Sequence, residues 1–350
     1  MIQDTNRKDD KVYYFPRNNN LDLLRLIFAL QVVVMHTSSH FNSTIKIPNF
    51  ISNFPGVPAF FFVSGFLIYS SYLNSPGKQY FLNRFLRLFP GLVIVTIGGV
   101  GVILLAQGWH SLQNNYSTFI FWFISQITIG QAYNPELFRT VGVGVINGSL
   151  WTITTEIIFY LIIPLIVWLE KRFRFVLMAL IVTSFVIYAI GPLCLNGIVY
   201  RNKSTFDFLA LTPIVWGWMF GLGIVAVKYY HKIIQFMKYA PLLLIPLFVM
   251  SFYGDGIFFA ASGNRLGLLY FICYSTLILW LAFWLPPVNL PFDYSYGAYI
   301  WHMPIVNLLL VFEFPSMPLA ISLTVFTAAV SWFLVEKPML KLKRQSLRQV

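Results

Sequence analysis

The sequence predicts an all-α polytopic membrane protein of about ten transmembrane helices, with both termini in the cytoplasm. Its composition is the first indication. Apolar residues make up 58% of the 350 residues and charged residues only 10%, whereas about a quarter of a typical soluble domain is charged. The second is a series of ten apolar runs that are long enough, or nearly so, to cross about 30 Å of hydrocarbon. The third is the distribution of lysine and arginine between the segments that join these runs.

The ten runs follow one another as a single membrane domain at residues 20–336. They are residues 20–40, 54–73, 88–107, 149–170, 174–195, 206–227, 239–256, 266–286, 296–312 and 317–335. Residues 117–130 form a further apolar stretch that is too short for a span, so we expect an interfacial or re-entrant helix within a long extracytoplasmic segment at 107–148. Residues 1–19 and 337–350 are expected to be cytoplasmic tails, the second of them basic.

The basic residues favour this orientation. With ten spans and the N-terminus inside, eighteen lysines and arginines fall on the cytoplasmic side and five outside, while Arg25 lies in the first span. A full crossing at residues 117–130 would move every later basic loop to the other side. The net charge of +12 follows mostly from this topology, and basic residues scattered over short loops do not predict nucleic-acid binding. Two cysteines in apolar stretches provide neither a disulfide framework nor metal-ligand spacing.

The first span carries two ionisable residues, Arg25 and His36. Eleven positions of an α-helix make three turns plus about 20°, so both side chains leave the same stripe about 16 Å apart. Ionisable groups inside a span are costly and usually functional. Alternative interpretations are a snorkelling side chain for Arg25 and a neutral ring bonded to a backbone carbonyl for His36.

Two later spans contribute Glu156 and His302. Counting about 1.5 Å per residue from the predicted membrane edges places Glu156 at the depth of His36 in the outer half, and His302 near Arg25 in the inner half. The sequence therefore predicts two polar layers. An alternative role for Glu156 is that of a structural partner for an internal cation, and His302 fits a structural role equally well.

Arg84 and Arg87 lie in the segment NRFLRLFPGL, which follows the second span. Residues three apart lie on one helical face. Two planar guanidinium groups side by side suit phosphate oxygens better than lysines do. Anchoring at the cytoplasmic face is the alternative interpretation of these two arginines.

In this order, the motifs resemble the integral-membrane acyltransferase family 3, whose members acylate sugars of cell-surface and secreted glycans. The resemblance covers roughly residues 19–340. It rests on LDLLRLIFALQVVVMH (21–36), FPGVPAFFFVSGFLIYSSY (54–72), NRFLRLFPGL (83–92), GSLWTITTEIIFYLIIPL (148–165), SYGAYIWHMPI (295–305) and WFLVEKP (332–338).

The resemblance implies an O-acyltransferase of the bacterial inner membrane. It would move an acyl group, acetyl by default, from cytoplasmic acyl-CoA to a hydroxyl of a cell-surface or exported glycan or a lipid-linked sugar, without a metal. In the family, the residues that match Arg25 and His36 are regarded as essential, and those that match Arg84 and Arg87 as engaging acyl-CoA. Glu156 matches the family's Trp-x4-Glu signature.

We therefore predict His36, Glu156 and Arg25 as catalytic residues, and Arg84, Arg87 and His302 as residues that bind the acyl donor. His36 is expected to deprotonate the attacking sugar hydroxyl, and Glu156 to orient its ring. An acyl-histidine intermediate is an open alternative.

A membrane transporter for protons or anions is the alternative function, because Arg25, His36, Glu156 and His302 would also suit an ion path. Transporters often carry paired repeats, and no internal repeat is evident here. The lack of a repeat disfavours a transporter, and a third class, a polytopic scaffold or sensor, is disfavoured because it gives no reason for this order of polar motifs.

Overall fold

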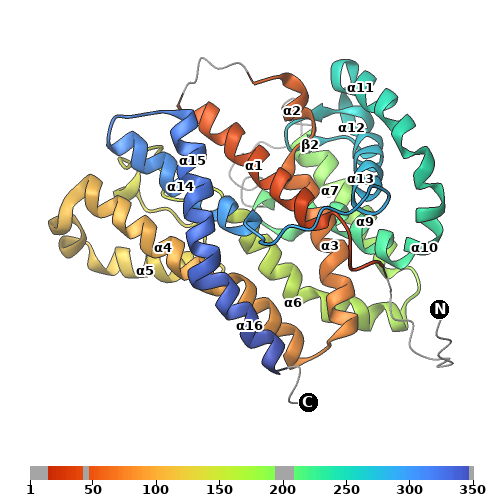
Figure 1. The fold of residues 1–350 in the computed structure, drawn as a ribbon, viewed down its shortest axis with the longest axis horizontal. Helices are drawn as coiled ribbons and strands as arrows, with labels where there is room; N and C mark the ends of the chain where they lie inside the picture. Colours follow the sequence, from red (N-terminus) through yellow and green to blue (C-terminus); the bar gives the residue numbers. More distant parts are fainter. Residues whose placement is uncertain (1–14, 42–46, 194–208, 347–350) are drawn as a thin grey trace.

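The computed structural model describes residues 15–41, 47–193 and 209–346, and shows a bundle of helices (Figure 1). In this part of the chain, six helical segments are long and apolar enough to cross a membrane: Leu21–His40, Ile51–Asn74, Lys78–Asn114, Trp151–Arg172, Tyr230–Tyr253 and Met317–Leu342. Shorter apolar helices cover Val176–Gly191, Pro213–Lys228 and Leu268–Phe283. The protein is thus helical with several candidate membrane spans. The count of about ten spans and the cytoplasmic location of the termini stay predictions.

The elements of the N-terminal half are α1 Leu21–His40, α2 Asn49–Asn53, α3 Gly56–Asn74, α4 Lys78–Asn114, α5 Tyr116–Gln126, η1 Glu136–Phe138, α6 Trp151–Arg172, α7 Val176–Tyr188 and η2 Ala189–Leu193. Those of the C-terminal half are α9 Pro213–Lys228, α10 Tyr230–Ile233, η3 Ile234–Leu243, α11 Leu244–Tyr253, α12 Gly256–Phe259, β1 Ala261–Ser262, β2 Arg265–Leu266, α13 Leu268–Phe283, α14 Ser295–Val311, α15 Met317–Ser331, η4 Trp332–Glu336 and α16 Lys337–Ser346. The two strands form a short antiparallel ribbon. Parts of the predicted spans 174–195 and 206–227 and of both tails lie outside the described residues.

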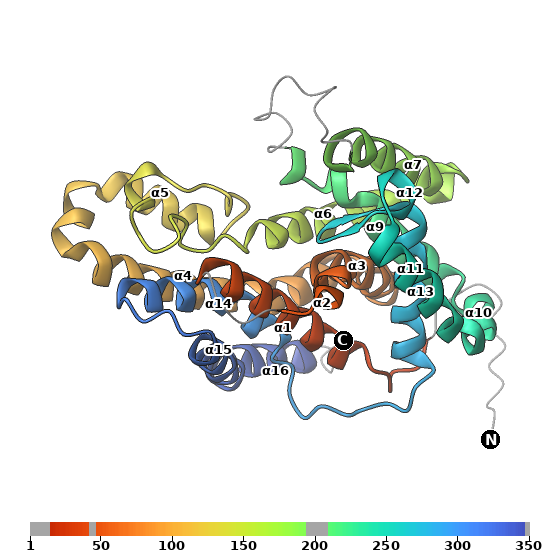
Figure 2. The same cartoon turned by 90° about the horizontal axis from the view of Figure 1, so that it is seen from above.

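Helices α1, α3 and α14 occupy the middle of the molecule (Figures 1 and 2). α4 and α5 lie at one end, and α7, α9, α11 and α13 at the other. α1 packs on both α3 and α14, and α14 also packs on α4 and α15. This arrangement brings the N-terminal motif of the chain against the C-terminal one.

The start of α1 is held by the buried side chain of Asn20. Its Nδ2 donates to the carbonyl oxygens of Leu281 (3.0 Å) and Pro286 (3.1 Å), and its Oδ1 accepts from the backbone N–H of Val288 (2.7 Å). Because these partners flank the end of α13, Asn20 fixes the position from which α1 enters the bundle. The depth of Arg25 and His36 follows from this anchor.

Helix α4 begins earlier than the apolar run at 88–107 predicts. Gly77 adopts a positive φ of 73°, which glycine tolerates without a steric cost, and the helix starts directly after it. Arg84 and Arg87 consequently lie within a helix rather than in a loop between spans. At its far end α4 is kinked at Gly108, whose φ is 75°, and α5 follows within the predicted extracytoplasmic segment.

Helix α14 is tied to the segment that precedes α6. Pro304 has no N–H to donate to the carbonyl of Ile300, and Asn147 Nδ2 donates to that oxygen instead at 2.8 Å. Asn307 Nδ2 donates to the carbonyls of Val145 and Ile146, each at 2.9 Å. These bonds fix α14 relative to α6, and hence the position of its polar residues relative to Glu156.

Close packing of α3 on α9 depends on glycine. A Cβ at Gly65 would lie 1.9 Å from the carbonyl oxygen of Phe220, and a Cβ at Gly223 would lie 2.0 Å from that of Phe62. Small residues allow membrane helices to approach this closely. Gly223→Leu should therefore force the helices apart and cost at least about 1–3 kcal/mol.

Thermal unfolding of the purified protein in detergent, followed by size-exclusion chromatography, measures this loss. Gly101→Leu is the matched control, because a Cβ at Gly101 in α4 meets nothing within 4 Å. Equal melting temperatures for the two variants would contradict the packing argument.

Candidate active site

Asp293 joins the two predicted arginine motifs. It lies just before α14, and its Oδ2 accepts from Arg25 Nη1 at 3.2 Å and from Arg87 Nη2 at 2.9 Å. Burial by itself would raise the pKa of the Asp293 carboxyl, but the guanidinium groups of Arg25 and Arg87 hold this pKa well below its usual range. The side chains are only 14% exposed for Asp293, 16% for Arg25 and 26% for Arg87. The three residues therefore form a largely desolvated ionic cluster at one end of the α1–α14 contact.

Arg84 lies near this cluster, and its guanidinium group contacts a serine hydroxyl and two tyrosine rings. Its Nη2 donates to Ser71 Oγ at 2.5 Å, and its guanidinium carbon lies 5.8 Å from the ring centre of Tyr80 and 5.4 Å from that of Tyr160. The buried Arg84 Nε has no hydrogen-bond partner among the described residues. One N–H of the Arg84 guanidinium is thus left without an acceptor.

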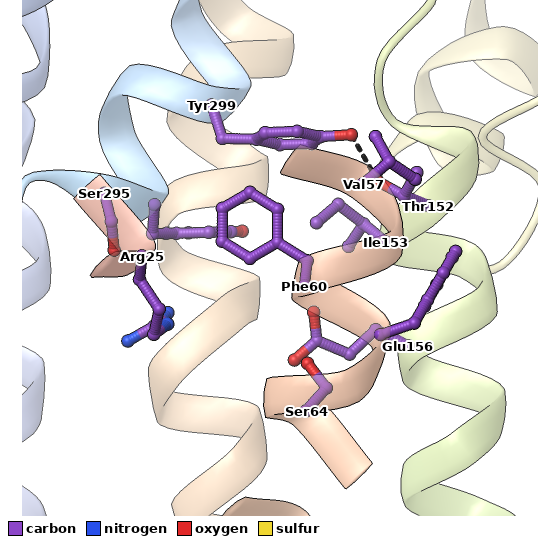
Figure 3. A pocket seen from close by; sticks show the side chains of 11 residues that line it. Arg25, Val57, Phe60, Ser64, Thr152, Ile153, Glu156, Ser295 and Tyr299 are labelled. Carbon is purple, nitrogen blue, oxygen red and sulfur yellow. Dashed lines mark hydrogen bonds between the residues drawn. The ribbon is translucent and has the colours of Figure 1, made fainter. Parts of the chain in front are cut away.

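Two adjoining cavities lie between these arginines and the interior of the bundle. The first, which we call the basic cavity, has a volume of about 300 Å³, and its lining includes Asp22, Arg25, Arg84, Arg87 and Glu156. The second, the aromatic cavity, is small, with a volume of about 40 Å³, and its lining includes Val57, Phe60, Phe61, Thr152, Ile153, Tyr296 and Tyr299 (Figure 3). Arg25, Ser64 and Glu156 line both, so the two cavities adjoin at these side chains.

Glu156 lies between the two cavities. It projects from α6 toward Ser64 of α3 in Figure 3, and its Oε1 accepts a hydrogen bond from Tyr160 one turn later. At the far end of the aromatic cavity, the Tyr299 hydroxyl lies 2.7 Å from Thr152 Oγ1. Thus one carboxylate stands at the junction, and a tyrosine closes the end opposite Arg25.

His36 and His302 form a pair beyond Tyr299. Nδ1 of His36 lies 2.9 Å from Nε2 of His302, and Nδ1 of His302 lies 2.7 Å from the carbonyl oxygen of Tyr299. His302 is fully buried, and His36 is partly buried. The rings of Tyr299 and His302 are 6.0 Å apart, and Phe60 packs against Tyr299 at 5.5 Å. Neither cavity defined above is lined by a histidine, so Phe60 and Tyr299 separate the aromatic cavity from the pair.

The predicted grouping of the polar residues is partly wrong. Counting residues from the predicted membrane edges predicts His302 near Arg25, whereas the structure places its ring against that of His36. The count assumed that the chain enters the membrane near residue 296, but Asp293 already lies at the level of Arg25. Helix α14 begins at Ser295, and its seven positions to His302, about 10.5 Å, then carry this residue toward the level of His36. The structure also brings Glu156 to the lining that holds Arg25, Arg84 and Arg87, and no hydrogen bond joins it to His36 among the described residues.

Sequence reasoning missed Asp293, Tyr160 and Tyr299. Asp293 stands alone in a loop of ordinary composition, so no local pattern marks it. Tyr160 follows Glu156 by four positions, and that helical spacing would have indicated the contact. The catalytic and donor-binding roles of the six predicted residues stay predictions. In the described residues, no group of three or more His, Cys, Asp or Glu side chains is arranged to hold a metal.

The part of the chain that resembles known proteins includes every residue of the candidate site. Residues 18–336 match the family model Acyl_transf_3, described as an acyltransferase domain. The chain is similar to nodulation protein 10 of Rhizobium leguminosarum bv. viciae, with 28% identity over 360 residues that cover 93% of this chain and 94% of that protein. It is also similar to an O-acetyl transferase of Shigella phage Sf6, with 28% identity over 346 residues that cover 92% and 96% of the two chains. No solved structure matches the chain significantly.

Proposed function

This chain belongs to the Acyl_transf_3 family of acyltransferases, and from that premise we propose that it transfers an acetyl group from cytoplasmic acetyl-CoA to a hydroxyl of a cell-surface or exported glycan. The acetyl group is supported by the similarity to the phage O-acetyl transferase. The acceptor class rests on the resemblance stated above. We further propose that the protein resides in the inner membrane of a bacterium.

The observation that carries the proposal is that the basic and aromatic cavities adjoin at Arg25, Ser64 and Glu156. The basic cavity presents Arg84 and Arg87 for the phosphates of coenzyme A. The aromatic cavity leads from Glu156 to Tyr299, one ring short of the histidine pair. A narrow cavity lined by aromatic side chains suits the pantetheine arm and a short acyl group. We propose that the thioester reaches His36 past Phe60 and Tyr299, whose side chains must move.

The chemical step follows from these positions. An unprotonated nitrogen of His36 takes the proton of the acceptor hydroxyl as the oxygen attacks the thioester carbonyl carbon. The carbon–sulfur bond then breaks, His36 returns the proton to the thiolate, and the products are the ester and the free thiol of coenzyme A. Glu156 holds the water or substrate groups at the junction of the cavities, and Arg25 holds the donor near Asp293. If His36 instead accepts the acyl group first, labelled acyl should be trapped on the protein without acceptor.

The test is acyl transfer by the purified protein. Detergent-solubilised enzyme is supplied with acetyl-CoA labelled in the acetyl group, and the release of free coenzyme A and the labelling of added glycan fractions are followed. Mass spectrometry of surface glycans from cells with and without the chain identifies the acceptor and the modified hydroxyl. The absence of both coenzyme A release and glycan labelling, with proton flux in reconstituted vesicles, would overturn the proposal in favour of a transporter.

Arg84→Ala should chiefly raise the KM for acetyl-CoA. The variant removes a ground-state contact to a phosphate, and charge-assisted hydrogen bonds contribute about 1.5–3 kcal/mol, which corresponds to about 10- to 150-fold in KM. Steady-state kinetics at saturating acceptor measures the change. Arg172→Ala is the matched control, because Arg172 is an exposed arginine at the end of α6. A loss confined to kcat would contradict phosphate docking at Arg84.

A further inference from the structure

The hydrogen-bond partners of His302 determine where its protons lie. A backbone carbonyl only accepts, so the 2.7 Å contact with the Tyr299 oxygen places a proton on Nδ1 of His302. The ring is fully buried, and a second proton would make it a desolvated cation, which is costly. His302 is therefore neutral, and its Nε2 carries a lone pair.

The same argument extends to His36. Its Nδ1 lies 2.9 Å from the unprotonated Nε2 of His302, so Nδ1 of His36 must be the donor. A neutral imidazole carries one proton, which leaves Nε2 of His36 unprotonated. The tautomer of a histidine is set by the hydrogen bond of its other nitrogen. The chain of contacts thus runs from His36 through His302 to the carbonyl of Tyr299.

His302 lines neither the basic nor the aromatic cavity, and we propose that, instead of binding the acyl donor, it is a positioning residue that holds His36 in the tautomer whose Nε2 accepts the proton of the attacking hydroxyl. The kinetic consequence rests on the proposed function. When His36 Nε2 gains this proton, Nδ1 of His36 still donates to Nε2 of His302. The lone pair on His302 Nε2 therefore stabilises the positive charge formed on His36. The proton then leaves from the same Nε2 to the coenzyme A thiolate, and His302 neither gains nor loses a proton in the cycle.

The surrounding fold holds the acceptor carbonyl in place. The next carbonyl of α14, that of Ile300, accepts a hydrogen bond from Asn147, and beyond His302 the side chain of Asn307 donates to the carbonyls of Val145 and Ile146. The opposite end of the α1–α14 contact is held by Arg25 and Asp293. Helix α14 is thus fixed on both sides of His302, and α1 is held at Arg25, which preserves the distance between the two rings.

The kinetic test compares two substitutions at position 302. His302→Gln keeps an oxygen that can accept from His36 Nδ1, whereas His302→Leu keeps bulk and removes the acceptor. We expect kcat to fall at least about tenfold in His302→Leu with the KM for acetyl-CoA nearly unchanged, and most of kcat to return in His302→Gln. His110→Leu, at an exposed position of α4, controls for loss of a histidine.

The second test reads the tautomer directly and needs no turnover. Nitrogen-15 spectra of histidine-labelled protein distinguish a protonated from an unprotonated ring nitrogen, and the His36→Ala variant assigns the signals of residue 36. The wild type should show Nδ1 protonated and Nε2 unprotonated at His36 near pH 7. In His302→Leu this pattern should be lost, and in His302→Gln it should be retained.

The outcomes distinguish a failure of the role of His302 from a failure of the proposed acyl transfer. Equal losses of kcat in the Leu and Gln variants, or an unchanged tautomer of His36 in the Leu variant, would overturn the role of His302. If the spectra follow the expected pattern but no acyl transfer occurs, the proposed function fails while the tautomer assignment stands. Thermal unfolding of each variant shows whether a lost activity comes from a lost fold.

Discussion

His36→Ala is expected to lower kcat for acyl transfer by about 10²- to 10⁴-fold, the usual contribution of a positioned general base. His36 is the member of the histidine pair that keeps partial exposure, whereas His302 is fully buried. An acceptor hydroxyl therefore has access to His36 alone. Steady-state kinetics with acetyl-CoA labelled in the acetyl group measures the loss, and a donor-binding assay on the same protein shows whether the basic cavity is still formed.

The His36→Ala experiment separates a chemical role from a structural one. The side chain lies more than two turns of α1 away from Arg25, so removing it should leave the KM for acetyl-CoA unchanged. His231→Ala serves as the control, because His231 is an exposed histidine of α10. Wild-type turnover in the His36→Ala variant would end its assignment as the base. An unfolded variant would instead indicate that the pair with His302 stabilises the bundle.

The helical class and the family could be predicted because both depend on local patterns. Long apolar runs predict membrane helices whatever their neighbours are, and the match to residues 18–336 confirms the family inferred from six motifs. The Arg25 to His36 spacing likewise depends only on the geometry of one helix, and α1 spans both residues. Predictions within a single element thus needed no knowledge of the packing.

Contacts between elements were harder to predict because they depend on where each helix enters the bundle. The loop before α14 carries Asp293 to Arg25 and Arg87, and this shift along the helix axis moves His302 from the expected inner layer to His36. An apolar run alone does not show such a shift. Similarly, the start of α4 at Lys78 depends on the conformation of Gly77, and the boundary of hydropathy falls about three turns later.

Replacing Asp293 is expected to destabilise the protein more than any other single substitution at the polar sites. Asp293→Leu would leave the guanidinium groups of Arg25 and Arg87 close together without their shared carboxylate. Removing one partner of a buried ion pair costs about 3–5 kcal/mol, because the remaining charge stays desolvated. Thermal or denaturant unfolding in detergent measures the loss. The matched control is Glu136→Leu, which removes the acidic partner of Arg139 from an exposed pair at 3.5 Å, where about 0–1 kcal/mol is expected.

A double-mutant cycle tests whether the ionic cluster itself is the cause. Arg87→Met combined with Asp293→Leu should be less destabilising than the sum of the two single variants, because the double variant removes both charges of one pair. Additive losses would show that Asp293 acts through packing instead.

The low pKa of Asp293 predicts how its contribution to stability depends on pH. A carboxyl whose pKa is lowered on folding stabilises fully above its unfolded pKa of about 3.9, and loses this contribution only as the pH falls further. The difference in stability between wild type and Asp293→Leu should therefore stay constant from neutral pH to about pH 5.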